Sequence, residues 1–159
     1  MSINSFPEIL NKMQSFCAYR DRCKYEVRQK LIEYNLPVSL NDQLIELLEK
    51  ENFINEDRFA FEFAHGKFRI KKWGRQKIKF ELLKKEVEQK LIVKAIGAID
   101  DDEYILTLKV LLEKKMKAII FKKNIQEAKI KVSRYAMVKG YESDLVWDIL
   151  NKIKITERK

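Results

Sequence analysis

The chain has 159 residues, enough for one domain or for a short array of small repeats that bury a core. Hydrophobic residues make up 46% of it, which argues against global disorder, while 4 Gly, 2 Pro and no Asn-Gly or Asp-Gly pair disfavour a β-rich fold. The 33 Lys or Arg exceed the 24 Asp or Glu, and the formal net charge of +9 favours anionic partners.

Apolar residues recur at three- and four-residue spacing along the whole chain, as in amphipathic helices. The stripes are, in chain order, Ile9, Met13, Phe16 and Cys17; Val27, Leu31 and Tyr34; Leu40, Leu44, Leu47 and Leu48; Phe59, Ala60, Phe63 and Ala64; Ile78, Leu82 and Leu83; Leu91, Ile92, Ala95 and Ile96; Tyr104, Leu108, Leu111 and Leu112; Ile125, Ala128, Val132 and Tyr135; and Val146, Ile149, Leu150 and Ile153. Pro37 ends the second stripe, and Ser39 is the predicted N-cap of the third. The pattern predicts about nine helices in three groups of three.

Two junctions between these groups repeat in sequence. "INEDRF" at 54–59 and "IDDDEY" at 99–104 share an Ile, a capping Asn or Asp, acids in the first turn and an aromatic residue. We expect a hydrophobic staple in each, with Ile54 packing on Phe59 and Ile99 on Tyr104. The acids then favour the positive end of the helix, so we interpret Asp100 as a cap and not as a metal ligand.

The middle helices of the three groups also correspond. Val27, Ile78 and Val132 occupy the same position in each, and an apolar residue closes each helix: Leu36, Val87 and Tyr141. The period is about fifty residues, which predicts tandem three-helix repeats in an elongated, curved array. The predicted repeats span residues 1–53, 54–98 and 99–159.

The stretch "GKFRIKKWGRQKIK" at 66–79 combines many cations with two aromatic residues and no acid. We expect Gly66 to end one helix and Gly74 to begin the next, leaving a basic connector between them. Its side chains suit a DNA backbone or an acidic protein surface, with Trp73 as an anchor; the alternative is a solvated face whose aromatic residues cover a junction between repeats. The candidate binding residues are Lys67, Arg69, Lys71, Lys72, Trp73, Arg75, Lys77 and Lys79.

A second basic cluster either extends this surface or is a solvated linker; it comprises Lys114, Lys115, Lys117, Lys122 and Lys123. No catalytic, cofactor-binding or metal-binding pattern is visible, since His65 is isolated and there is no Gly-rich phosphate loop. Cys17 and Cys23 do not form a CxxC motif, and we expect reduced thiols. With no apolar segment of membrane-spanning length, we expect a cytoplasmic protein. Because no catalytic pattern is visible, we expect that it is not an enzyme.

Three segments together resemble the bacterial RecX regulatory proteins. They are "FINEDRFAFEFAHGKFRIKKWGRQKIKFELLKKEV", "YRDRCKYEVRQKL" at 19–31 and "YAMVKGYESDLVWDIL" at 135–150, and their order and spacing cover nearly the whole chain. Asn35 stands where the first repeat of the family often has Gly.

The resemblance implies an all-α array of three-helix repeats without a cofactor. It also implies that the chain binds the RecA recombinase, lodges along the RecA filament on single-stranded DNA, and restrains ATPase, strand exchange and co-protease activity in DNA repair and recombination. Single- or double-stranded DNA is a further possible partner of the basic stretch, and we expect a monomer. The competing interpretation is a nucleic-acid-binding module of helix-turn-helix type, although the helix from 75 to 86 offers mostly Lys, which contacts phosphate and not base edges.

Overall fold

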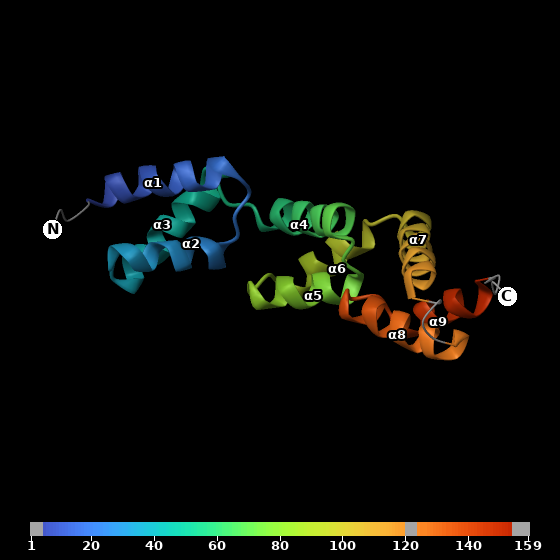
Figure 1. The fold of residues 1–159 in the computed structure, drawn as a ribbon. Helices are drawn as coiled ribbons and strands as arrows, with labels where there is room; N and C mark the ends of the chain where they lie inside the picture. Colours follow the sequence, from blue (N-terminus) through green and yellow to red (C-terminus); the bar gives the residue numbers. More distant parts are fainter. Residues whose placement is uncertain (1–4, 120–123, 154–159) are drawn as a thin grey trace. The chain divides into compact units, whose positions relative to one another are not determined.

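The computed structural model describes residues 5–119 and 124–153, and all regular structure in these ranges is helical (Figure 1). The predicted all-α fold class is confirmed. The elements are α1 (Phe6–Tyr19), α2 (Lys24–Leu31), the 3-10 turn η1 (Ile32–Tyr34), α3 (Val38–Lys50), α4 (Glu56–Lys71), α5 (Arg75–Lys84), α6 (Gln89–Gly97), α7 (Asp101–Ile119), α8 (Ile125–Val138) and α9 (Ser143–Lys152).

The chain forms two compact units, each made of two stretches of sequence. Unit 1 comprises Met1–Phe63 and Leu82–Ala95, and unit 2 comprises Ala64–Glu81 and Ile96–Lys159. Helices α4, α5 and α6 therefore each contribute residues to both units. The repeat boundaries at 1–53, 54–98 and 99–159 follow a sequence pattern and remain a prediction.

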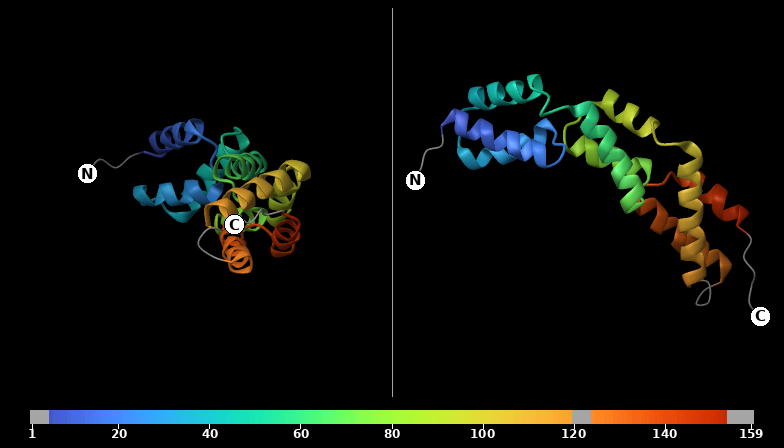
Figure 2. Two further views of the ribbon diagram at one scale, coloured as in Figure 1. Left: turned by 45° about the vertical axis from the view of Figure 1, so that its right-hand side comes forward. Right: turned by 90° about the horizontal axis from the view of Figure 1, so that it is seen from above.

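The core of unit 1 is built where α1, α2 and α3 lie side by side (Figure 2). Helix α1 begins with a capping box, in which the Glu8 amide donates to the Ser5 hydroxyl and the Ser5 amide donates to the Glu8 carboxylate, both at 3.4 Å. The buried members of the core are Ile9, Met13, Cys17, Val27, Leu31, Leu44, Ile45, Leu48 and Ile54. The apolar stripes predicted for the first three helices supply this core except for Ile45 and Ile54, which were not on them.

Helix α3 begins earlier than the sequence indicated. Pro37 occupies the N-cap position, and its carbonyl accepts from the amides of Leu40 and Asn41 at 3.0 and 3.1 Å. The prediction of Ser39 as N-cap is wrong, because proline fixes a backbone angle suited to entering a helix and Ser39 already lies within it.

A left-handed residue stands one position before each apolar residue that was predicted to close a middle helix. These residues are Asn35 (φ 53°), Glu86 (φ 58°) and Gly140 (φ 102°). The residues that follow Glu86 and Gly140 make the hydrogen bonds of a Schellman motif. The amide of Val87 donates to the Leu82 carbonyl and the amide of Tyr141 donates to the Ala136 carbonyl, both at 3.2 Å. Asn35 adopts the conformation that glycine takes most readily, which fits its place in the family pattern.

Helix α4 starts as predicted but ends later. Asn55 caps it, since the Asn55 side chain accepts from the Arg58 amide at 3.0 Å. The prediction that Gly66 ends the helix is wrong: α4 continues to Lys71, and Lys72 supplies the left-handed residue (φ 60°). A single glycine costs a helix about 1 kcal/mol, and burying the Phe68 ring two residues later outweighs that cost.

Unit 2 is built around α7, α8 and α9 together with parts of α4 and α5 (Figure 1). The rings of Phe68, Tyr104 and Tyr141 form a row through its core, with centroids 5.7 and 5.2 Å apart. Asp100 caps α7 as predicted, because its carboxylate accepts from the Glu103 amide at 2.9 Å. Ile54, Phe59, Ile99 and Tyr104 are all buried, while the two staple contacts themselves stay a prediction.

The stripe predicted for α8 is shifted by one residue at its end. Ala136 is fully buried, whereas Tyr135 is 37% exposed. The first two stripe positions facing the core, Ala128 and Val132, are buried as expected, and Ala136 continues their four-residue spacing. None of the helices in the described part of the chain is both long and apolar enough to cross a membrane.

Candidate functional site

All eight candidate binding residues lie in unit 2, between positions 67 and 79. They occupy the last turns of α4, the connector at 72–74 and the first turns of α5. The predicted basic connector is therefore mostly helical, because α4 runs through Gly66. Helical structure at both ends fixes the direction of each side chain and separates the cations into groups with different surroundings.

Two of the cations surround the indole of Trp73. The ammonium of Lys67 lies 5.0 Å from the ring centroid and that of Lys77 lies 4.6 Å from it. Trp73 itself is half-buried. Cation–π attraction thus holds these two lysines against an aromatic surface, as expected for an anchor that lies partly at a protein surface.

Arg75 has internal partners. Its guanidinium contacts Glu142 at 2.9 Å and Asp101 at 2.8 Å, and it lies 3.8 Å from the centroid of the Tyr104 ring. The Arg75 amide donates to the Tyr104 hydroxyl at 3.1 Å, and that hydroxyl donates in turn to Glu142. Burial and the Glu142 carboxylate raise the pKa of Tyr104 well above its usual range, so the phenol stays protonated. The structure therefore gives Arg75 a role inside unit 2.

The connector is fixed to the end of α8 through its main chain. The amide of Gly74 donates to the Lys139 carbonyl at 2.7 Å, and the amide of Gln76 donates to the Gly140 carbonyl at 3.0 Å. The Tyr141 hydroxyl donates to the Lys72 carbonyl at 2.9 Å. These bonds use backbone groups and one buried phenol, and none of them uses the ammonium group of Lys72.

The remaining candidate cations point outward. Lys71, Lys72 and Lys79 are exposed, and Arg69 has a 65% exposed side chain whose Nε lies 3.8 Å from Glu103. An exposed ion pair at that distance contributes little. The exposed cations of the predicted stretch are thus Arg69, Lys71, Lys72 and Lys79.

The second basic cluster lies on the same unit. Lys114 and Lys117 are exposed on α7, and the ammonium of Lys115 lies 4.4 Å from the centroid of the Tyr135 ring. Lys122 and Lys123 lie outside the described residues. Lys139 joins this cluster to the first, since its ammonium donates to the Lys71 carbonyl at 3.2 Å and lies 5.7 Å from the Tyr135 centroid. Sequence reasoning missed Tyr135 and Lys139 because the first fell on an apolar stripe and the second stood alone.

Charge is divided very unequally between the two units. Unit 2 holds 21 Lys or Arg against 11 Asp or Glu, a formal net charge of +10. Unit 1 holds 12 against 13, a formal net charge of −1. The excess positive charge of the chain therefore belongs to the unit that carries the candidate residues, where it attracts anions.

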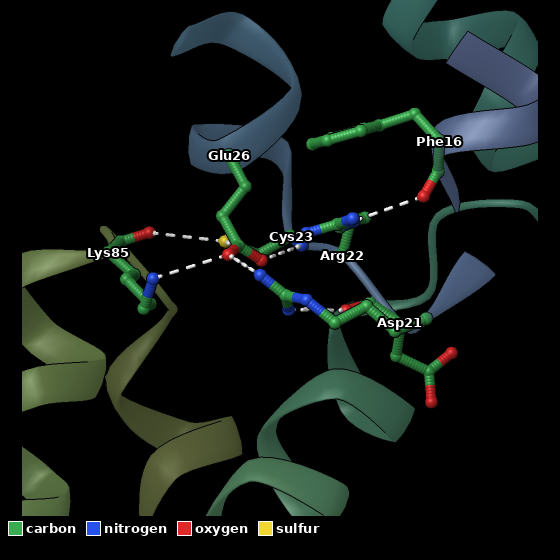
Figure 3. Close-up of polar contacts among 7 residues, drawn as sticks. Phe16, Asp21, Arg22, Cys23, Glu26 and Lys85 are labelled. Carbon is green, nitrogen blue, oxygen red and sulfur yellow. Dashed lines mark hydrogen bonds and ion pairs between the residues drawn. The ribbon is translucent and has the colours of Figure 1, made fainter. Parts of the chain in front are cut away.

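Unit 1 contains a polar cluster that the sequence did not indicate, centred on Glu26 (Figure 3). Its carboxylate accepts from Arg20 at 2.8 Å, from Lys85 at 3.4 Å and from the Cys23 amide at 3.3 Å. Burial alone would raise the pKa of Glu26, but these donors outweigh it and lower the pKa below 4.5. The cluster fastens the start of α2 to the end of α5, so we assign it a structural role.

Both cysteines are free and buried in unit 1. Burial raises the pKa of each thiol from 9.0 to about 11, which keeps both protonated at neutral pH. A buried protonated thiol packs as a small apolar side chain and is a poor nucleophile. Their positions agree with the expected reduced thiols.

Comparison with known proteins identifies the family. Residues 55–96 match the family model described as RecX, second three-helix domain. Regulatory protein RecX of Clostridium perfringens (strain SM101 / Type A) is 30% identical over 134 residues, which are 83% of this chain and 62% of that protein. Regulatory protein RecX of Clostridium tetani (strain Massachusetts / E88) is 31% identical over 130 residues, which are 80% of this chain and 59% of that protein. The chain belongs to the RecX family.

Solved RecX structures share the fold. A crystal structure of regulatory protein RecX matches with a TM-score of 0.83 at 17% identity and covers 92% of this chain and 72% of that one. The crystal structure of RecX from Lactobacillus salivarius matches with a TM-score of 0.82 at 19% identity and covers 92% of this chain and 95% of that one. The chain spans about 60% of the length of the two clostridial RecX proteins. All eight candidate residues lie within the stretch that matches the second RecX domain.

Proposed function

We propose that this chain binds the RecA recombinase filament on single-stranded DNA and restrains its ATPase, strand-exchange and co-protease activities. The observation that carries the proposal is the similarity to proteins named regulatory protein RecX over about four fifths of the chain. The relatives are named as regulators and not as enzymes. Action as a monomer in the cytoplasm is part of the same proposal.

The surface of unit 2 supports a partner that presents negative charge. The filament offers two such partners, the phosphates of its DNA strand and acidic patches of RecA itself. Lys71, Lys72 and Lys79 are exposed cations within the stretch that matches the second RecX domain, and Trp73 supplies an aromatic anchor beside them. Contacts to phosphate would be independent of sequence and would weaken steeply with salt.

The test is ATP hydrolysis by RecA filaments formed on single-stranded DNA, with the purified chain added in increasing amounts. We expect suppression by the wild type and weaker suppression by a variant with Lys71→Ala, Lys72→Ala and Lys79→Ala. Arg75 is left unchanged because it stabilises unit 2. The matched control carries the same loss of charge on exposed lysines of unit 1: Lys12→Ala, Lys50→Ala and Lys90→Ala.

Duplex recognition by α5, as in a helix-turn-helix protein, is the competing function. The exposed positions of α5 are Gln76, Lys79, Phe80, Leu83 and Lys84. Only the first of these is an amide side chain of the kind that pairs with adenine, and two are apolar. Unchanged ATP hydrolysis at saturating protein, together with salt-sensitive binding to duplex DNA, would contradict the RecA proposal and favour this function.

A further inference from the structure

Tyr135 lies at the surface of unit 2 between two lysines that come from different elements. The residue as a whole is 37% exposed. Lys115 from α7 places its ammonium 4.4 Å from the ring centroid, and Lys139 at the C-cap of α8 places its ammonium 5.7 Å from it. An aromatic ring with a partly open surface and a cation on each of two neighbouring elements is therefore built into this part of the fold.

More lysines surround this ring. Lys139 donates to the Lys71 carbonyl at 3.2 Å, so the end of α4 at Lys71 and the connector residue Lys72, both exposed, lie next to Lys139. Lys131 precedes Tyr135 by one helical turn and is also exposed. We define the Tyr135 surface by these six residues: Lys71, Lys72, Lys115, Lys131, Tyr135 and Lys139. Within the described ranges no carboxylate lies at ion-pair distance from its five lysines, so their charge is not compensated locally.

We propose that the Tyr135 surface binds an unpaired nucleic-acid strand, with one base stacked on Tyr135 and the flanking phosphates held by the lysines. An aromatic ring set among cations is the arrangement that sequence-independent strand binding requires, because every base has a π-face and every linkage carries a charge. A duplex keeps its bases stacked on each other and offers none to the ring. The net charge of +10 on unit 2 strengthens the attraction to a phosphate chain over that to a neutral partner.

This inference deepens the proposed function and rests on it for one point, the identity of the strand as the DNA of the filament. Strand binding itself does not depend on RecA. It also separates the basic residues of unit 2 into two sets. Five lysines belong to the Tyr135 surface (Lys71, Lys72, Lys115, Lys131 and Lys139), while the ammonium groups of Lys67 and Lys77 lie over Trp73.

The experiment is a fluorescence-anisotropy titration without RecA, using a labelled oligothymidylate and an abasic oligonucleotide of the same length and charge. We expect the wild type to bind the oligothymidylate roughly tenfold more tightly than the abasic oligonucleotide. Tyr135→Leu should remove this difference, Tyr135→Phe should keep it, and Tyr19→Leu, at an 85% exposed tyrosine of unit 1, should leave it unchanged. Lys115→Gln and Lys139→Gln should each lower the slope of log affinity against log salt by about 0.7.

A second measurement avoids substitution of the ring altogether. The wild-type chain is cross-linked by ultraviolet light to an oligonucleotide that contains bromodeoxyuridine, and the modified peptide is identified by mass spectrometry. A cross-link at Tyr135 supports the inference. Equal affinity for the two oligonucleotides, or cross-links confined to unit 1, would overturn it. If strand binding fails while RecA ATP hydrolysis is still suppressed, only this inference is lost; strand binding without any suppression refutes the proposed function instead.

Discussion

Gly74 and Gly140 approach each other so closely that a Cβ atom on either glycine would clash with neighbouring atoms. A Cβ on Gly74 would meet the carbonyl group of Gly140 and the amide of Tyr141, and a Cβ on Gly140 would meet Lys77. This is the place where the connector between α4 and α5 is hydrogen-bonded to the end of α8.

Gly74→Ala should therefore lower the stability of unit 2. The atoms that a methyl group would meet belong to the backbone, which cannot rotate away, so we expect a loss of about 2 kcal/mol or more in the free energy of unfolding. Gly66→Ala is the matched control, since nothing lies within 4 Å of a Cβ there and the residue is inside α4. That control should gain up to about 1 kcal/mol. Urea unfolding measures both, and equal midpoints would contradict the close approach.

Arg75 and Lys79 should respond differently to truncation, although the sequence placed both in one basic stretch. Arg75→Ala leaves Glu142 and Asp101 without their cation and should cost about 2 kcal/mol of unfolding free energy. Lys79→Ala removes an exposed side chain and should change stability by less than about 0.5 kcal/mol. Thermal unfolding of the two variants gives the comparison; a Lys79 variant that melts as early as the Arg75 variant would refute it.

Glu26 should make the stability of unit 1 depend on pH in the acid range. Its pKa in the folded chain is lower than 4.5, so the ionised form is favoured by folding; the stabilisation is present above pH 4.5 and is lost as the pH falls through the lowered pKa. Glu26→Gln should be less stable than the wild type at neutral pH, and the difference should shrink as the solution is acidified. Unfolding curves from pH 7 downward test this. Glu46→Gln, at an exposed site on α3, should show no such convergence.

The two thiols should be unreactive while the chain is folded. Burial raises the pKa of Cys17 and Cys23 to about 11, so at neutral pH almost no thiolate is present and access is blocked as well. We expect a disulfide reagent to label neither thiol rapidly in native buffer and to label both in denaturant. Fast labelling of either cysteine in the native chain would show that it is accessible.

Much of the fold could be predicted because it depends on local patterns. Three kinds of feature involve only residues within one or two helical turns of each other. They are the apolar stripes, the helix cap at Asp100, and the helix ends that the sequence placed at Leu36, Val87 and Tyr141. Gly66 shows the limit of such reasoning, since a glycine can either end a helix or lie inside one. Which of the two occurs here depends on whether a continuing helix buries the side chain of Phe68.

The candidate site was predicted less completely than the fold, because the partners of its residues lie far away in sequence. The composition identified the basic stretch, yet nothing local distinguishes Arg75 from the lysines around it. Its partners Asp101 and Glu142 come from α7 and from the N-cap of α9. Tyr135 is the opposite case, since it falls on an apolar stripe by spacing but reaches the surface because Ala136 fills the core position.

In the joint between the connector and α8, the groups that stabilise unit 2 are different from the lysine side chains that are exposed to a partner. Backbone amides and carbonyls form it, with the Tyr141 hydroxyl on the Lys72 carbonyl, and none of these bonds uses the Lys71 or Lys72 ammonium group. Substitutions at those two lysines can accordingly retune the strength of an electrostatic contact at little cost to folding. Evolution or protein engineering can therefore change the affinity for a partner through these two positions while the fold of unit 2 stays the same.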